Sequence, residues 1–404
     1  MNFKLFSSVL VSIVLFSCQH PAENSVGNLF SEPASTLQSS DSKKIKYNRP
    51  KEILSKESKL NIPYRSLNTS KTITSFGFGS CVNQNQEQSL WKIVQAKAPQ
   101  IFIMMGDNVY ASKAEDKPII DQYIKLNSNS DYLKARESIP FLATWDDHDF
   151  GQNDGGFDNP EKLEARRVFL KYWSYLNNIL PKDQDAIYHS RLIGEKKQQV
   201  QFIMMDTRFD RFPVVLTESL PTFAATATVS ASADNTLVKA SLKTSHKFSE
   251  NLDPKAQILS DAQWKWLDNE LKKPAELRIL ISSIQFLAND HGYEKWGLFP
   301  NERKKLLNLL EKNKIKNLII LSGDRHLASI AKLKTKNGDL FDITSSSINK
   351  PSKATEPEID QLYTAPSYLN INFGFAEIDW SKKQIEFQII GEDAQSHLNQ
   401  VIKF

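Results

Sequence analysis

Cysteine is scarce in this chain, which has Cys18 and Cys81 among its 404 residues. The two cysteines lie in segments of different character, so we do not expect them to pair. A framework of several disulfides, which supports many small secreted domains, is therefore excluded. A chain of this length can bury a sizeable hydrophobic core and needs no such support. The low cysteine count therefore leaves the cellular compartment open.

An excess of charge of one sign is also missing. The chain has 51 basic and 47 acidic side chains and a formal net charge of +4. Nucleic-acid-binding domains usually carry a clustered basic face. The lysine-rich stretch from Glu302 to Asn317 instead has the pattern of a solvated helix side. We therefore expect no specific nucleic-acid binding, and we expect the chain to act as a monomer.

No apolar run is long enough to cross a bilayer comfortably as a permanent helix. The run Leu5–Phe16 follows Lys4 and ends at Leu-Phe-Ser-Cys, the last residue being Cys18. This pattern predicts a secretory signal peptide over residues 1–17. Its ending resembles the bacterial lipobox, in which the cysteine becomes the lipidated first residue. The prediction is therefore a protein anchored by lipid at Cys18 to a bacterial membrane, in the cell envelope; an ordinary signal peptide is the alternative.

The chain after the signal peptide changes character near residue 70. Residues 18–70 are rich in serine, asparagine and lysine, and they lack the apolar surface needed to fold independently. They are expected to form a polar tether whose later part lies along the domain surface. Residues 71–404 are expected to form the folded domain. Within it, residues 221–252 are small, polar and weakly periodic, which predicts an insertion loop that could cover a site.

Buried strands and amphipathic helices alternate through the domain. Continuous apolar runs predict strands that are buried on both faces; these runs begin at Thr72, Gln100, Ile139, Val200, Leu277 and Asn317. Helices are expected between them over Ser89–Pro99, Pro160–Asn177, Asp261–Leu271 and Asn301–Asn313. Two paired strands are expected near the C-terminus. The alternation indicates an α/β fold class.

Polar side chains follow five of the apolar runs closely. These residues are Cys81; Asp107, Asn108 and Tyr110; Asp146, Asp147, His148, Asp149 and Asn153; Asp206 and Arg208; and Asp324, Arg325 and His326. Ligands of open α/β sheets bind beyond the carboxyl ends of strands, so the five groups could converge at one edge. Three carboxylates around His148 would repel one another unless cations or hydrogen bonds compensated them. Their mixed oxygen, nitrogen and sulfur donors favour more than one kind of metal.

Single residues of this set have simpler explanations. A lone buried cysteine such as Cys81 is usually part of a core, and a lone aspartate after a strand, such as Asp107, often caps a helix. Arg208 could be held in an ion pair with Asp206 or Asp210. The recurrence of the groups, and not any one of them, favours a metal site.

These segments together resemble the alkaline phosphatase D (PhoD-like) family of metallophosphoesterases. The resemblance lies in "FGSC", "GDNVY", "ATWDDHDFGQNDGG", "MMDTRFDR", "QWKWLDNEL", "EKWGLFPNER" and "SGDRH", in this order from Phe78 to His326. It implies a four-layer α/β/β/α metallophosphoesterase sandwich. It also implies hydrolysis of phosphate esters, as a phosphomonoesterase, a phosphodiesterase or both.

The resemblance assigns metal ligands to matching positions. Cys81, Asp107, Tyr110 and His326 would bind Fe³⁺. Asp107 would also bridge to Ca²⁺, and Asn153 and Asp324 would complete the calcium sites. Other divalent metals such as zinc or manganese remain the alternative. No twin-arginine pair precedes the apolar run, so we expect the metals to be acquired outside the cytoplasm.

The remaining roles concern the substrate. His148 occupies the position of a proton donor, and Asp147 would orient it or assist the metals. Arg208 and Arg325 are expected to contact the phosphate, because guanidinium donors match paired phosphate oxygens. The expected partner is a small or polymeric phosphate ester. A phosphodiesterase specific for phospholipid or cell-wall polymer and a non-catalytic, metal-binding envelope lipoprotein are the alternatives.

Overall fold

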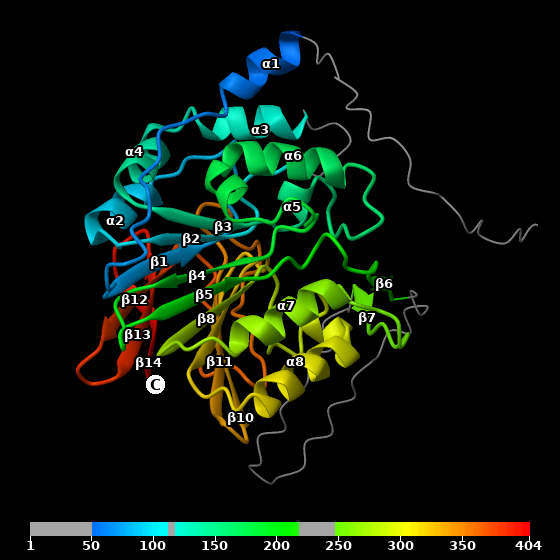
Figure 1. Ribbon diagram of the computed structural model, residues 1–404, viewed down its shortest axis with the longest axis vertical. Coiled ribbons are helices and arrows are strands. Elements are labelled where there is room, and N and C mark those ends of the chain that lie inside the picture. Colours follow the sequence, from blue (N-terminus) through cyan, green and yellow to red (C-terminus); the bar gives the residue numbers. More distant parts are fainter. Residues whose placement is uncertain (1–50, 112–117, 218–246) are drawn as a thin grey trace, which may run out of the picture. The chain divides into compact units, whose positions relative to one another are not determined.

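The computed structural model describes residues 51–111, 118–217 and 247–404, and side chains from residue 55 onward (Figure 1). The predicted signal peptide, the lipidation site Cys18, most of the predicted tether and most of the predicted insertion loop lie outside these residues. Among the helices that the structure describes, none has the length and apolar character needed to span a bilayer.

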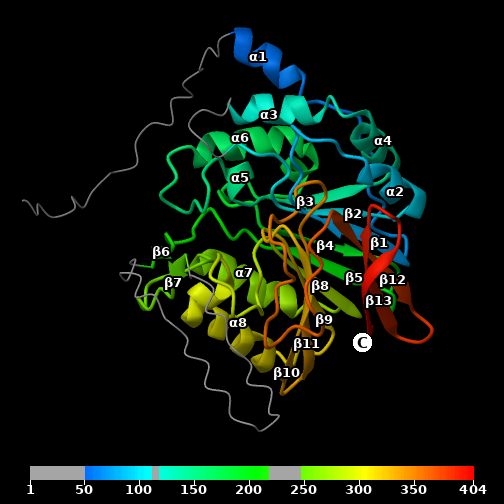
Figure 2. The same ribbon diagram turned by 180° about the vertical axis from the view of Figure 1, so that it is seen from behind.

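Two six-stranded sheets form the centre of the domain. The first sheet has the order β14 (Ser396–Lys403), β13 (Gln384–Gly391), β12 (Asn372–Asp379), β1 (Ser75–Gly79), β2 (Phe102–Met105) and β3 (Phe141–Thr144). The second has the order β10 (Ala328–Thr335), β11 (Gly338–Ser345), β9 (Leu318–Ser322), β8 (Leu277–Ser282), β5 (Val200–Met204) and β4 (His189–Ile193). The runs β1–β2–β3 and β5–β8–β9–β11 are parallel, and the remaining pairs are antiparallel. The view from behind shows β9 beside β11 (Figure 2).

Helices cover the outer face of each sheet (Figure 1). The first sheet is covered by α2 (Leu90–Lys97), α3 (Ile119–Leu126), α4 (Ser130–Ser138), α5 (Asp147–Phe150), α6 (Lys162–Tyr172) and the 3₁₀ turn Ser174–Asn178. The second sheet is covered by α7 (Asp261–Leu271) and α8 (Pro300–Lys312), with a 3₁₀ turn at Trp296–Leu298. The predicted four-layer α/β/β/α sandwich is therefore confirmed.

Alternating side chains explain why the apolar runs are continuous. Successive residues of a strand point to opposite faces. On β2, Phe102 and Met104 pack toward the helices, whereas Ile103 and Met105 join the core between the sheets. On β5, Phe202 enters that same central core. Each central strand thus needs apolar residues at every position, because both of its faces are covered.

The packed part of the chain begins before the expected boundary at residue 71. A helix, α1 (Lys51–Ser58), precedes the first sheet, and Leu60 just after it is 1% exposed. Lys56 Nζ lies 2.9 Å from an Asp121 carboxylate oxygen on α3, and Glu57 pairs with Arg167 on α6. The sequence predicted that the later part of the tether lies along the domain surface, and these contacts and the burial of Leu60 attach this part to the domain.

The end of the predicted insertion loop also belongs to the packed domain. The short strand β6 (Val215–Leu216) pairs antiparallel with β7 (Phe248–Ser249). Phe248 is 3% exposed and joins the core under α7 and α8. Residues 221–246 of the predicted loop lie outside the described part of the chain.

A buried histidine on β4 gives the fold a testable pH dependence. His189 is 4% exposed, and its Nδ1 donates to the Ile187 carbonyl at 2.9 Å. Burial lowers the pKa of His189 from 6.5 to about 4. Between pH 6.5 and about pH 4, His189 binds a proton in the unfolded chain but not in the folded protein. The free energy of unfolding is therefore highest above pH 6.5 and falls as the pH is lowered toward 4.

We expect His189→Gln to remove this titration. Between about pH 6.5 and pH 4, the free energy of unfolding of the wild type should fall by about 3 kcal/mol more than that of the variant. Chemical denaturation of both proteins across this window measures the difference. A difference that stays constant with pH would contradict the assignment.

Candidate metal centre

The polar groups singled out in the sequence meet where the parallel strands of both sheets end. Cys81 follows β1, Asp107 follows β2, and Asp147 follows β3. From the second sheet, Asp206 follows β5 and Asp324 follows β9. Strands that run in parallel place their carboxyl ends at one edge, so residues distant in sequence gather there.

Four groups of side chains in the described part of the chain are close enough to hold a metal ion. Within each group, ligand atoms lie within 4.8 Å of one another. The groups are Cys81, Asp107 and His326; Asp107, Asp147 and His148; Asp146, Asp147 and Asp324; and Asp147, Asp154 and Glu294. Because Asp107 belongs to two groups and Asp147 to three, the groups form one continuous cluster.

The first group is extended by a tyrosine. Tyr110 donates its hydroxyl hydrogen to Asp107 Oδ2 at 3.0 Å, and its oxygen lies 3.1 Å from His326 Nε2. The thiol of Cys81 lies 3.5 Å from the same Asp107 oxygen. The structure thus brings together the four residues expected to bind one cation: thiol, phenol, imidazole and carboxylate.

His148 lies beside this group. Its ring centroid is 4.1 Å from that of Tyr110, and its backbone N–H donates to Asp107 Oδ1 at 3.3 Å. Asp147 precedes it on the short helix α5 and accepts the backbone N–H of Asp154 at 2.7 Å. The imidazole and the carboxylate therefore reach the centre from the same turn.

Unusual backbone conformations accompany these positions. Cys81, Asp107, Asp154, Asp324 and His326 all have positive φ angles, between 50° and 69°. Such angles are uncommon outside glycine, and they persist where the surrounding structure enforces them. Strain of this kind gathers at functional sites, which supports the assignment of this edge as the site.

Two glycines allow the loops to approach closely. Gly106, with φ of 108°, would place a Cβ 2.5 Å from Asp146 Cβ. A Cβ at Gly323 would lie 2.6 Å from Ser80 Oγ. Any side chain at these positions would push the strand ends apart, so glycine is required by the close packing.

The cluster concentrates buried negative charge. Burial, with the neighbouring charges of Cys81 and Asp147, raises the pKa of Asp107 well above its usual value. Burial and the carboxylates of Asp146 and Asp147 do the same for Asp324. Burial acts to raise the pKa of Asp147 too, but the charges of His148 and Arg208 outweigh it and lower that pKa. In the protein alone, these carboxylates cannot all ionise without mutual repulsion.

The residues present fit bound cations. Asp146 Oδ2 is buried and accepts no hydrogen bond from the described residues. Cations would compensate the carboxylates and use such an oxygen. A thiolate and an imidazole suit a transition metal, whereas carboxylates suit hard cations. This edge of the sheets can therefore hold metal ions.

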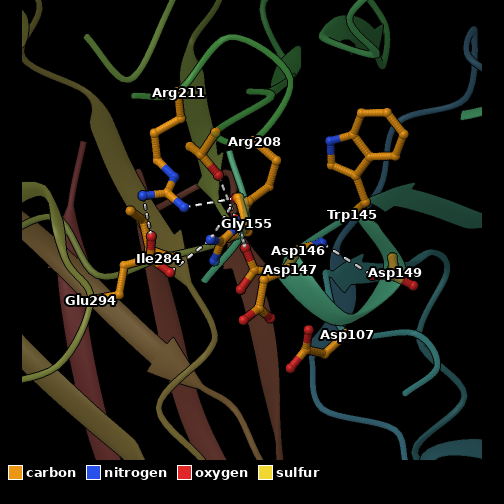
Figure 3. Close-up of polar contacts among 12 residues, drawn as sticks. Asp107, Trp145, Asp146, Asp147, Asp149, Gly155, Arg208, Arg211, Ile284 and Glu294 are labelled. Carbon is orange, nitrogen blue, oxygen red and sulfur yellow. Dashed lines mark hydrogen bonds and ion pairs between the residues drawn. The ribbon is translucent and has the colours of Figure 1, made fainter. Parts of the chain in front are cut away.

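A buried ion-pair network supports one side of the cluster (Figure 3). Arg208 Nε lies 2.5 Å from Asp146 Oδ1, and Arg208 Nη1 lies 2.7 Å from Glu294 Oε2. Arg211 Nη1 lies 2.8 Å from Glu294 Oε1. Arg208 and Arg211 are fully buried. Arg208 is thus held in an ion pair, as one interpretation of the sequence foresaw, but its partners are Asp146 and Glu294 and not Asp206 or Asp210.

Two carboxylates named in the sequence analysis serve the fold around the centre. Asp149 accepts hydrogen bonds from the Asn108 backbone and side chain and from the Tyr123 hydroxyl. Asp206 accepts from Trp145 Nε1 at 2.8 Å and from three backbone N–H groups. These bonds fix the turns that present the other side chains.

The remaining two expected residues lie at the margin of the cluster. Arg325 is turned toward Glu358, with Nη2 at 2.5 Å from Oε2, and its guanidinium lies over the Tyr293 ring. Asn153 is exposed and donates to Asp154 Oδ2 at 2.5 Å. None of these contacts is with Asp107 or Asp147, the carboxylates that the metal groups share.

Three residues of the site were not recognised from the sequence as its members. Asp154 is adjacent in sequence to the expected ligand Asn153, and Glu294 lies within the family-like segment "EKWGLFPNER". Both residues could therefore have been recognised from the sequence motifs. Lys350, whose Nζ lies 3.4 Å from the centroid of the Tyr110 ring, lies in none of these motifs. An isolated lysine after a strand has no sequence pattern that points to a site.

Comparisons with known proteins agree with this geometry. A family model described as PhoD-like phosphatase matches residues 120–389. Alkaline phosphatase D of Bacillus subtilis (strain 168) is 22% identical over 249 residues, which cover 56% of this chain but only 37% of the Bacillus protein.

Solved structures share the fold. A structure of PhoD has a TM-score of 0.62 at 14% identity, covering 84% of this chain and 70% of that one. Purple acid phosphatase PPD1 from yellow lupin (Lupinus luteus) seeds has a TM-score of 0.53 at 10% identity, with coverages of 83% and 55%. A dimetal phosphatase from Danio rerio has a TM-score of 0.50 at 11% identity, with coverages of 83% and 100%. The arrangement of the sheets is therefore that of metallophosphoesterases, and the family model, which covers most of the chain, shows that this protein belongs to the PhoD-like phosphatase family.

Proposed function

We propose that this protein hydrolyses phosphate esters with the help of bound metal ions. The observation that carries the proposal is the sharing of Asp107 and Asp147 among the candidate metal groups. Carboxylates shared in this way would hold cations next to each other. Adjacent cations can bind phosphate oxygens, acidify an attacking water and offset the charge that develops during phosphoryl transfer.

The chain's own residues would divide the remaining tasks. Burial lowers the pKa of His148, and the charge of Asp147 acts in the opposite direction. Its imidazole can donate an N–H hydrogen bond to a phosphate oxygen, and its protonated form can transfer a proton to the leaving alcohol. Asp147, adjacent in the chain, would orient His148 or support the cations. Arg325 would have to leave Glu358 to contact the phosphate, and Arg208 would act on it only through Asp146.

The donor types support particular metals. Cys81, Tyr110, His326 and Asp107 offer sulfur, phenolic oxygen, nitrogen and carboxylate, a set that suits Fe³⁺. Carboxylates Asp147 and Asp324, with the amide of Asn153, offer oxygen donors that suit Ca²⁺. Zinc or manganese is the alternative if iron is not bound.

The predicted location completes the proposal. The N-terminal pattern around Cys18 supports export and anchoring of the enzyme by lipid to a bacterial membrane. Its substrate would then be a phosphate ester of the cell envelope or its surroundings.

The metal assignment can be tested by spectroscopy. Thiolate and phenolate ligands on ferric iron should give a visible charge-transfer absorption. Tyr110→Phe should weaken this absorption per bound iron, because it removes the phenolic oxygen and keeps the ring. Elemental analysis should find iron and calcium in the purified protein. Full activity without iron, after expression with ample iron, would contradict the assignment.

Paired variants separate catalysis from metal binding. His148→Ala should lower turnover of a phosphate ester by about 100-fold or more, the usual scale for a general acid, and should leave metal content near that of the wild type. Asp107→Ala should lose metal and activity together, because two candidate groups share this carboxylate.

Bound metal and ester hydrolysis are measured in parallel, with the exposed His397→Ala as a control for histidine removal. If His148→Ala lost the metals as completely as Asp107→Ala, His148 would be a ligand. If it kept full activity, its proton-donor role would be wrong.

The location is tested at Cys18. Cys18→Ser should release the protein from membranes or leave an uncleaved precursor, because a lipid chain could no longer be attached. Fractionation of cells followed by mass measurement of the N-terminus shows which form is present. Membrane partitioning and processing identical to the wild type would rule out lipidation at this residue.

A further inference from the structure

A lysine from the loop after β11 lies against the candidate metal centre. Lys350 Nζ is 3.4 Å from the centroid of the Tyr110 ring, and the Tyr110 hydroxyl lies 3.1 Å from His326 Nε2. The Tyr110 ring also lies beside His148, with the two ring centroids 4.1 Å apart. The ammonium group therefore lies against a ring that contacts both histidines.

The loop that carries Lys350 is tied to the centre on both sides. The backbone N–H of Ile348 donates to the Ser80 carbonyl at 3.1 Å. The backbone N–H of Ser352 donates to the His326 carbonyl at 2.7 Å. Ser80 precedes the candidate ligand Cys81, and His326 is itself a candidate ligand. Lys350 thus stands in a segment that the strand ends hold in place.

The neighbouring chain restricts Lys350 further. Pro351 follows it directly, and a residue before proline is confined to extended conformations. Asn349, which precedes Lys350, is fixed by two hydrogen bonds to the backbone of Asn83. Its side-chain oxygen accepts from the Asn83 N–H at 2.6 Å, and its side-chain nitrogen donates to the Asn83 carbonyl at 2.8 Å. These contacts fix the backbone of Lys350, so binding of an anion requires ordering of its side chain only.

The arginines near the centre are differently placed. Arg208 is fully buried between Asp146 and Glu294, and Arg325 is paired with Glu358. The Lys350 ammonium lies over an aromatic face that belongs to the centre itself. Lysine binds phosphate as a point charge, so it needs no fixed fork of donors.

We propose that Lys350 binds the second negative charge of a phosphomonoester, and so makes this site favour monoester dianions over diester monoanions. This inference rests on the proposed function and specifies its substrate class. A monoester carries nearly two charges above its second pKa of about 6, whereas a diester carries one. Electrostatic attraction grows with the product of the charges, so one ammonium discriminates between the two esters.

The alternative role for Lys350 is packing on the Tyr110 ring, as a cation–π contact. Two substitutions separate charge from packing. Lys350→Met keeps a long apolar stem and removes the charge, and Lys350→Arg keeps the charge. Lys353→Met is the matched control, because Lys353 is an exposed lysine of the same loop.

The kinetic test compares p-nitrophenyl phosphate with bis(p-nitrophenyl) phosphate on the metal-loaded protein at about pH 8, above the second pKa of a phosphate monoester. Lys350→Met should lower the ratio of kcat/KM for monoester over diester by about 10-fold or more, the scale of one lost charge-assisted hydrogen bond. Lys350→Arg should largely restore the ratio, and Lys353→Met should leave it unchanged. Metal content should be the same in all variants. An unchanged ratio in Lys350→Met would overturn the proposal.

A binding measurement keeps this inference separate from the proposed function. Calorimetry with inorganic phosphate should show affinity about 10-fold weaker in Lys350→Met, whereas affinity for dimethyl phosphate should change much less. Equal losses for both anions, or no loss, would overturn the role of Lys350. If the wild type hydrolysed neither ester but bound phosphate in this Lys350-dependent way, the proposed function would fail and the role of Lys350 would stand. Lys350→Gln provides the same test if the methionine variant does not fold.

Discussion

Negative charge buried at the junction of the two sheets is the constraint on which this structure depends. Asp146 comes from the end of the first sheet, and Arg208 comes from the end of the second. Their ion pair is fully buried and continues to Glu294 and Arg211. Removing one partner of a buried pair leaves an uncompensated charge, which costs about 3–5 kcal/mol. The network therefore joins the two sheets at the same place where it sets the charge of the candidate metal centre.

The same constraint explains how the centre can be both crowded and well ordered. Asp107 and Asp147 are shared by the candidate groups, and burial with neighbouring charges raises the pKa of Asp107. The positive φ of Asp107 and the space at Gly106 bring the strand ends close enough for this sharing. The favourable free energy of packing the two sheets offsets the cost of these unusual backbone conformations. Cations would then relieve the repulsion that the protein alone leaves at this edge.

Much of the architecture could be predicted because its signals are local. Apolar runs at β2, β5 and β8 marked strands covered on both faces, and the helix Asp261–Leu271 was predicted with its observed bounds. The short helices α3 and α4 and the edge strands β4, β10 and β14 were not predicted. Their sequences are short or alternate polar and apolar residues, so contacts with neighbouring elements decide their conformation. The burial of Leu60, in the part of the tether that was expected to lie along the domain surface, also depends on such contacts.

The sequence by itself determined the chemical types available at the strand ends: thiol, phenol, imidazole and carboxylate. These residues follow strands whose apolar patterns can be recognised along the chain, so their convergence could be expected. Tertiary structure alone decided that Arg208 pairs with Glu294, that Asp154 joins the carboxylates, and that Lys350 covers Tyr110. These contacts join segments distant in sequence, and the distance between such segments depends on how two sheets pack and how their loops are tied. No local pattern of residues encodes that distance.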